Sequence, residues 1–128
     1  MEFIQVYKCL CDVQRLRILN LLKDGPLCVC HLVEILDSDQ VKISKQLRYM
    51  KELRMVEDER VAQWKVYHLA DATNPLLREN LKCLQDCYGE SIEFDTDIQK
   101  RSVVTARTLR ENAACARAVS GQRSSKNL

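Results

Sequence analysis

Apolar residues recur every three or four positions along most of the chain, as expected of amphipathic helices. This spacing predicts a short first helix over residues 2–11, after which Asp12 stands where a helix N-cap is expected. The second helix then ends at Gly25-Pro26, and the polar turn over residues 37–39 offers another N-cap. Further helices are predicted over about 27–36, 40–53 and 75–90.

The period of the pattern changes after residue 54. Residues 55–70 alternate weakly between polar and apolar side chains, and a turn around Ala62 predicts a two-stranded hairpin. Two helices followed by a hairpin is the order of a winged helix-turn-helix, in which the second helix enters the major groove of DNA. The predicted fold class is therefore mainly α with a β-hairpin. The pattern alone fits a helical core with an added hairpin equally well.

The chain becomes polar after residue 90. A helix is expected over about 100–118, and residues 119–128 are expected to form a free tail. We therefore predict a winged helix-turn-helix DNA-binding and dimerisation domain over residues 1–90. A polar C-terminal extension, partly helical and then flexible, is expected over residues 91–128.

Composition and charge narrow the class of protein. No run of ~18 apolar residues is available to span a membrane, and the N-terminus lacks a secretory signal, so a cytoplasmic protein is expected. The net charge is +2, but residues 100–128 hold seven basic residues and one acidic residue, which leaves the first 99 residues net acidic. Any case for DNA binding therefore rests on local pattern rather than on total charge.

Seven cysteines are many for a chain of 128 residues. A secreted disulfide framework normally has a signal peptide and an even number of cysteines. The remaining interpretations are buried core thiols, ligands of a metal or metalloid, and a redox switch.

Four segments carry a pattern more specific than their periodicity. They are Asp12 with Arg15-Leu16-Arg17-Ile18-Leu19, the cysteine box Leu27-Cys28-Val29-Cys30-His31-Leu32, the segment Gln40-Val41-Lys42-Ile43-Ser44-Lys45-Gln46-Leu47, and Trp64-Lys65-Val66-Tyr67-His68-Leu69. In this order they resemble the motifs of the ArsR/SmtB family of metal-sensing repressors. The resemblance covers residues 3–90 and implies a homodimeric winged-helix repressor. It also implies a metal site in the cysteine box, a recognition helix over 40–53 and a dimerisation helix over 75–90.

The resemblance is incomplete at five positions, one of which is His68, where the family has a wing arginine. His31 stands where the family box has aspartate, and Val33 stands where arsenic-sensing boxes often have a third cysteine. Arg54 and Ala62 occupy positions where the family usually has glycine, before the first wing strand and in the wing turn.

Cys28 and Cys30 are the candidate ligands for a soft ion such as As(III), Cu(I), Cd(II) or Zn(II). A helix N-terminus lowers the pKa of a thiol and favours the thiolate. On an ideal helix the two side chains point ~200° apart, so they would bind one ion only if the first turn unwinds. Unwinding would move the recognition helix and couple ion binding to DNA release. Two inert packed thiols are the alternative.

A trigonal site needs a third ligand. Cys9 and Cys11 are candidates, although packing in the core explains them as well. Cys83 and Cys87 share one helix face and suit either a joint ligand pair or a packed dimer seam. His31 is expected to be a polar surface residue rather than a ligand, and the cysteine in the tail is expected to be a bystander.

The exposed face of residues 40–53 is the candidate DNA interface. Its basic side chains would bind phosphates, while its Gln and Ser side chains offer hydrogen-bonding groups to base edges. The acidic wing segment 57–59 would repel phosphate, so contacts are expected mainly from the helix. A homodimer would face a palindromic operator with half-sites about one helical turn apart. The candidate residues, for which a solvated helix face is the alternative, are Gln40, Lys42, Ser44, Lys45, Gln46 and Arg48.

Together these features predict a repressor that binds double-stranded operator DNA and is released by a thiophilic ion, with arsenite preferred. Cys28, Cys30 and at least one more cysteine would bind the ion, and no organic cofactor is expected. The alternatives are a thiol-based redox-sensing repressor and a DNA-binding or interaction module with inert cysteines. An enzyme is not expected, because the chain has neither a Gly-rich phosphate loop nor a nucleophile elbow.

Overall fold

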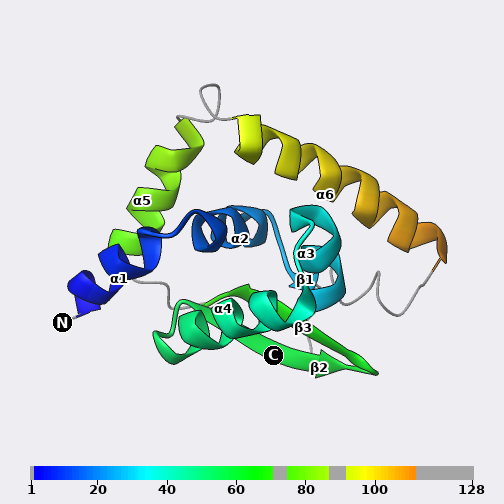
Figure 1. Cartoon of the computed structure of the whole chain (residues 1–128), viewed down its shortest axis with the longest axis horizontal. Coiled ribbons are helices and arrows are strands. Elements are labelled where there is room, and N and C mark those ends of the chain that lie inside the picture. The colour runs from blue at the N-terminus through cyan, green and yellow to red at the C-terminus, as the bar shows by residue number, and fades with distance from the viewer. Residues whose placement is uncertain (1, 71–74, 87–91, 112–128) are drawn as a thin grey trace, which may run out of the picture.

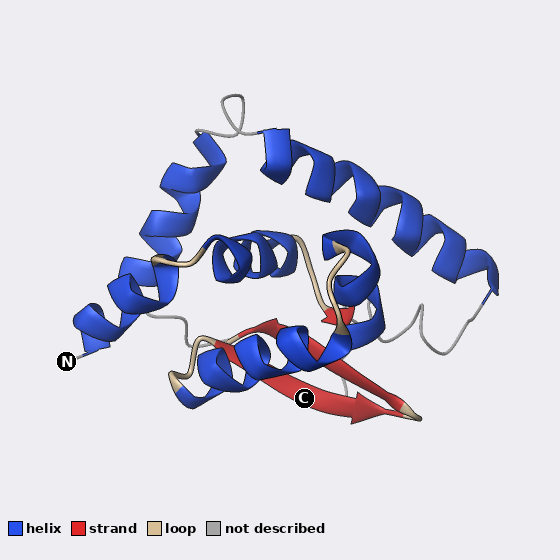
Figure 2. Cartoon of the chain, in the orientation of Figure 1, coloured by secondary structure: helices blue, strands red, loops and turns tan. Residues whose placement is uncertain are grey.

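The computed structural model describes residues 2–70, 75–86 and 92–111, in which a small antiparallel sheet lies at one edge of a set of helices (Figure 1). This arrangement confirms the predicted fold class, mainly α with a β-hairpin (Figure 2). In chain order the elements are α1 (Glu2–Leu10), α2 (Val13–Lys23), β1 (Leu27–Cys28), α3 (Val29–Leu36), α4 (Gln40–Glu52), β2 (Val56–Val61), β3 (Trp64–Leu69), α5 (Pro75–Asp86) and α6 (Ile92–Glu111).

Side-chain caps set where α2 and α4 begin. The Asp12 carboxylate accepts a hydrogen bond from the backbone N–H of Arg15 at 3.0 Å, and Asp39 accepts one from the backbone N–H of Lys42 at 2.8 Å. Each cap satisfies a backbone donor that the first turn of a helix leaves without a partner. Both predicted caps are confirmed.

The hydrophobic core centres on α2, which lies in the middle of the molecule (Figure 1). One apolar cluster takes side chains from every helix and strand, so a displacement of one element is felt by its neighbours. Representative members are Val6, Leu19, Leu27, Leu32, Leu47, Val56, Tyr67, Leu77 and Val104.

Leu27 and Cys28 form a strand rather than the first turn of a helix. Leu27 pairs with Tyr67 and Cys28 pairs with Val66, which gives the strand order β1-β3-β2. The prediction of a helix from residue 27 is therefore wrong, and α3 begins at Val29. The cause is tertiary, because so short a strand has no period of its own and pairs with a segment far along the chain.

The predicted hairpin forms from β2 and β3, in a register that pairs Val56 with Leu69 and Val61 with Trp64. Its turn contains Ala62 at φ 57°, and Arg54 at φ 62° precedes the first strand. Both angles lie in the left-handed region that glycine adopts most readily. The chain thus forms these turns with side chains in place, at a cost of about 1–2 kcal/mol for each position.

Helix α6 lies across α2 and α3 (Figure 1). Arg17 of α2 donates two hydrogen bonds of 2.8 Å to the carboxylate of Asp97, which is fully buried. Arg101 donates to the Asp24 carbonyl and passes so near Gly25, whose φ is +136°, that a side chain there would meet it at 3.0 Å. The helix therefore begins at Ile92, earlier than the predicted start near residue 100, because its first turns already pack on the core.

Some predictions fall outside the described residues, namely those for Cys87, for the tail cysteine Cys115 and for residues 119–128. The boundary drawn at residue 90 falls between α5 and α6 and stays a prediction. Among the described helices, none combines the length and the apolar character needed to cross a membrane.

Candidate functional site

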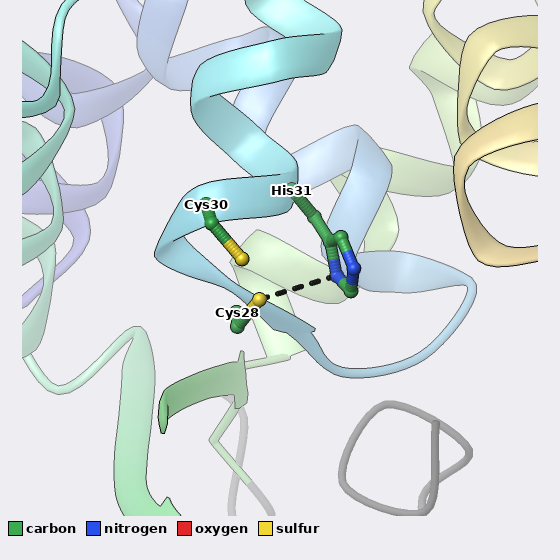
Figure 3. A group of neighbouring side chains, drawn as sticks. All are labelled: Cys28, Cys30 and His31. Atoms are coloured by element: carbon green, nitrogen blue, oxygen red, sulfur yellow. Dashed lines mark hydrogen bonds between the residues drawn. The ribbon is translucent and has the colours of Figure 1, made fainter. Parts of the chain in front are cut away.

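Cys28, Cys30 and His31 gather where β1 becomes α3 (Figure 3). The two sulfur atoms and an imidazole nitrogen lie within 4.8 Å of one another. Cys28 has extended backbone angles (φ −84°, ψ 163°), whereas Cys30 lies in the first helical turn, so the two thiols do not share one regular helix. The predicted unwinding is therefore not required, because the pairing of β1 already holds Cys28 outside the helix.

His31 lies between Cys28 and the C-terminal helix, and its side chain is only 4% exposed. Its Nδ1 atom is 3.3 Å from Cys28 Sγ, and its Nε2 atom is 2.9 Å from Thr108 Oγ1. The Thr108 hydroxyl donates its one proton to the Val104 carbonyl at 2.9 Å, so it accepts from Nε2–H of His31. Nδ1 then accepts from the Cys28 thiol. The prediction of a polar surface histidine is wrong, because α6 covers this side of α3.

The protonation of the group follows from its surroundings. Burial lowers the pKa of His31, so the imidazole is neutral near pH 7. The pKa of Cys30 is raised, first by its hydrogen bond with Cys28 and then by desolvation of its sulfur. The expected lowering of the thiol pKa by the helix N-terminus is therefore outweighed, and an ion that binds here must displace thiol protons.

The other described cysteines lie apart from this group. Cys9 is buried in the core, and burial raises the pKa of its thiol. Cys11 and Cys83 are exposed, on the α1–α2 junction and on α5. Within the described chain, none of these thiols comes near enough to Cys28 and Cys30 to share an ion with them.

Two thiols and one imidazole form a donor set for soft and borderline ions. For Zn(II), the three donors would fill three positions of a tetrahedron. For As(III), which favours sulfur, the two thiolates would fill two positions of a trigonal site and leave the third open. The residues present therefore fit a thiophilic ion. Whether the third ligand is the imidazole nitrogen or another sulfur depends on which of the two the ion prefers.

Three of the candidate DNA contacts lie one helical turn apart on α4. Gln40, Ser44 and Arg48 line a cavity of about 520 Å³, and Cys28 and Cys30 line the same cavity. The two cysteines and one face of the predicted recognition helix therefore line the same cavity.

The remaining candidates on α4 take different positions. Lys42 and Lys45 are exposed and do not line the cavity. Gln46 is half-buried, and its side-chain oxygen accepts a hydrogen bond from Arg15 at 3.1 Å. Arg15 also stacks over the ring of Tyr49, 4.7 Å from its centroid. Gln46 therefore helps to hold α4 against the preceding helices.

The wing closes the other side of the cavity with Arg60, Trp64 and Lys65. The carboxylate of Asp58 lies 3.0 Å from the ammonium group of Lys51 and 3.3 Å from that of Lys65. Burial of Asp58 opposes its ionisation, but the contacts with both lysines outweigh this and lower its pKa. One of the three acidic residues of the wing is thus neutralised locally, which weakens the repulsion expected from that segment.

Sequence reasoning missed Thr108 and the shared cavity. Thr108 lies 77 residues beyond His31, and no short motif includes it. The cavity depends on how α4, β1 and the hairpin pack together, which local periodicity does not reveal. The unusual histidine in the cysteine box was the one sequence signal that pointed toward this environment.

Part of the chain matches a known family of regulatory proteins. Residues 12–58 match the family model described as bacterial regulatory protein, arsR family. The chain is 42% identical over 91 residues to the arsenic resistance transcriptional regulator ArsR1 of Pseudomonas putida, covering 70% of this chain and 71% of that protein. It is 35% identical over 91 residues to the arsenical resistance operon repressor of Bacillus subtilis, covering 70% of this chain and 87% of that protein.

A solved structure supports the fold. The homodimeric winged helix-turn-helix DNA-binding domain of a Mycobacterium bovis protein aligns with a TM-score of 0.58 and 24% identity. The alignment covers 70% of this chain and 80% of that domain. The described elements therefore form a winged helix-turn-helix.

Thr108→Val keeps the shape of the side chain but removes the hydroxyl that accepts from His31. We expect the free energy of unfolding to fall by about 1–3 kcal/mol, because a buried N–H loses its partner. Denaturant unfolding measures this loss. In ¹⁵N NMR spectra, His31 should carry its proton on Nε2 in the native protein, and this preference should be lost in Thr108→Val. The matched control is Thr105→Val, since the Thr105 hydroxyl donates only to backbone carbonyls of its own helix. Equal losses in the two variants, or an Nδ1–H tautomer in the native protein, would refute this arrangement.

Proposed function

The chain belongs to the ArsR family of bacterial transcriptional regulators, and we propose that it is a homodimeric repressor released from operator DNA by arsenite bound at Cys28 and Cys30. The P. putida and B. subtilis relatives carry the names of an arsenic resistance regulator and an arsenical resistance repressor. The members of this family are DNA-binding regulators rather than enzymes, in line with the sequence prediction.

One observation supports the effector site above all. The sulfur atoms of Cys28 and Cys30 and a nitrogen of His31 lie within 4.8 Å of one another, in the box that resembles the family's metal site. The thiols face each other without rearrangement of the chain, so little ordering entropy is lost when an ion binds.

His31 has a chemical role in this proposal. Arsenite, As(OH)₃, exchanges hydroxyl groups for thiolates, and each exchange releases one water molecule. Because Nδ1 of His31 accepts from the Cys28 thiol, it can take the Cys28 proton and pass it to a departing hydroxyl. No oxidant or reductant is needed, since arsenic remains trivalent.

Helix α4 supplies the DNA contacts in this proposal. Lys42, Lys45 and Arg48 are exposed and bind phosphates, while Gln40 and Ser44 offer hydrogen-bonding groups to base edges. Gln46 acts indirectly, through its hydrogen bond with Arg15. In a dimer, two copies of α4 enter successive major grooves of a palindromic operator.

The proposed arsenite ligands and proposed DNA contacts of α4 line the same cavity. Cys28 is paired with the wing strand β3, and both cysteines share the cavity with Arg48 of α4. An ion that draws the two thiols together alters the wall between recognition helix and wing. Effector and operator therefore bind different arrangements of this wall, and each lowers the affinity for the other.

The dimer is proposed to form through α1 and α5, which contact each other. α1 exposes Ile4 and Tyr7, which are 48% and 49% accessible, and α5 corresponds to the helix that the family resemblance assigns to dimerisation. A partner protomer would cover these apolar side chains.

Cys28→Ser and Cys30→Ser should each leave operator binding intact but raise the arsenite concentration needed for release by about a hundredfold or more. The operator is first selected from random DNA by binding to the native protein, and release is followed by fluorescence anisotropy. Cys83→Ser is the control and should respond as the native protein does. An unchanged arsenite response in the Cys28 and Cys30 variants would contradict the assignment of these two residues as arsenite ligands. Release by peroxide but not by arsenite would identify a redox-sensing repressor instead.

Lys42→Ala and Lys45→Ala should each weaken operator binding and reduce the slope of log K against log salt by about 1, because one phosphate contact is lost. Lys82→Ala, on the exposed face of α5, is the control and should leave the slope unchanged. The measurement is a salt titration of operator affinity. Native slopes in both α4 variants would argue against α4 as the phosphate-binding helix.

A further inference from the structure

We propose that the cavity between α4 and the wing binds a small anionic thiol, whose sulfur completes the coordination of arsenic at Cys28 and Cys30. This inference rests on the proposed arsenite site and specifies its missing ligand.

The need for an external sulfur follows from the donors in reach. Within the described residues, the group around Cys28 and Cys30 contains no third thiol, and its third member is the imidazole of His31. Trivalent arsenic favours sulfur over nitrogen, as soft ions do. Val33, where a third box cysteine would stand, is apolar and packs against the core. Among the described residues no thiol occupies the third position of a trigonal arsenic site, so a ligand from outside the chain can bind there.

The cavity offers the space for such a ligand. Its volume of about 520 Å³ lies within the range of small-molecule pockets, and Cys28 and Cys30 form part of its wall. An arsenic atom bound to these two thiols therefore lies at the cavity wall, and a third ligand can bind it from within the cavity. A thiol of a few carbon atoms fits there without displacement of the hairpin.

The charge of the cavity selects for an anion. Four basic side chains line it, and none of the described residues that line it is acidic. Two of the four, Lys51 and Lys65, share the carboxylate of Asp58. Arg48 and Arg60 form no ion pair within the described part of the chain, so they remain available to a carboxylate on the ligand.

The ligand exchange balances without a change of oxidation state. As(OH)₃ reacts with the thiols of Cys28, Cys30 and the small molecule, three As–S bonds replace three As–O bonds, and three water molecules leave. The carboxylate of the small thiol then lies against Arg48 and Arg60. It occupies space beside α4 and cancels positive charge on the face that we propose binds DNA phosphates, so it promotes release.

Trp64 provides a direct probe, because it lines the cavity and is the one tryptophan in the chain. The protein, without DNA, is titrated with arsenite in the presence of one of three thiols of similar size: 3-mercaptopropionate, 2-mercaptoethanol or cysteamine. Sulfur–arsenic absorbance reports coordination, and Trp64 fluorescence reports occupation of the cavity. The anionic thiol should lower the arsenite concentration for half-saturation by about fivefold more than the neutral thiol, the effect of ~1 kcal/mol of charge attraction. The cationic thiol should be the weakest.

Arg48→Gln and Arg60→Gln test the origin of this preference. Each should shrink the advantage of the anionic over the neutral thiol, while Arg78→Gln on α5 should leave it unchanged. Equal half-saturation with all three thiols would overturn the proposal. Full three-sulfur absorbance without any added thiol would also overturn it, because a cysteine of the protein, from either protomer, would then supply the third sulfur. If arsenite does not bind the native protein under any of these conditions, the proposed function fails as well.

Discussion

The antiparallel pairing of Leu27 with Tyr67 and of Cys28 with Val66 is the constraint on which the site depends. This pairing holds Cys28 in extended backbone, so that its thiol meets Cys30 instead of pointing to the opposite side of a helix. The same pairing joins the cysteine box to the strand that forms the wing. The short strand β1 thereby gives the chain a preformed thiol pair and places that pair beside α4 and the wing.

Helix α6 adds a second constraint from the other side of α3. Its Thr108 fixes the tautomer of His31, and its Asp97 is held by Arg17 of α2. The match to the family model ends at residue 58, well before this helix. Helix α6 therefore couples the proposed effector site to contacts outside the segment that matches the family model, and His31 links the two.

The parts of the fold that depend on local chemistry could be predicted from the sequence. Helix spacing, the caps at Asp12 and Asp39 and the hairpin are local features, and the structure confirms them. The short strand β1 and the docking of α6 could not be predicted, because both depend on partners far along the chain. For the site, the resemblance directed attention to Cys28 and Cys30, whose sulfur atoms lie close together in the structure, whereas the burial of His31 required knowledge of α6. The roles of these residues stay predictions until ion and DNA binding are measured.

The central claim is that the effector site and the DNA-binding face are coupled through one shared cavity. Its most direct test is the arsenite affinity of the free protein compared with that of the protein saturated with its selected operator, both measured by sulfur–arsenic absorbance. The account predicts that operator DNA weakens arsenite binding by the same factor by which arsenite weakens operator binding, as thermodynamic linkage requires. Equal arsenite affinities with and without operator would contradict it.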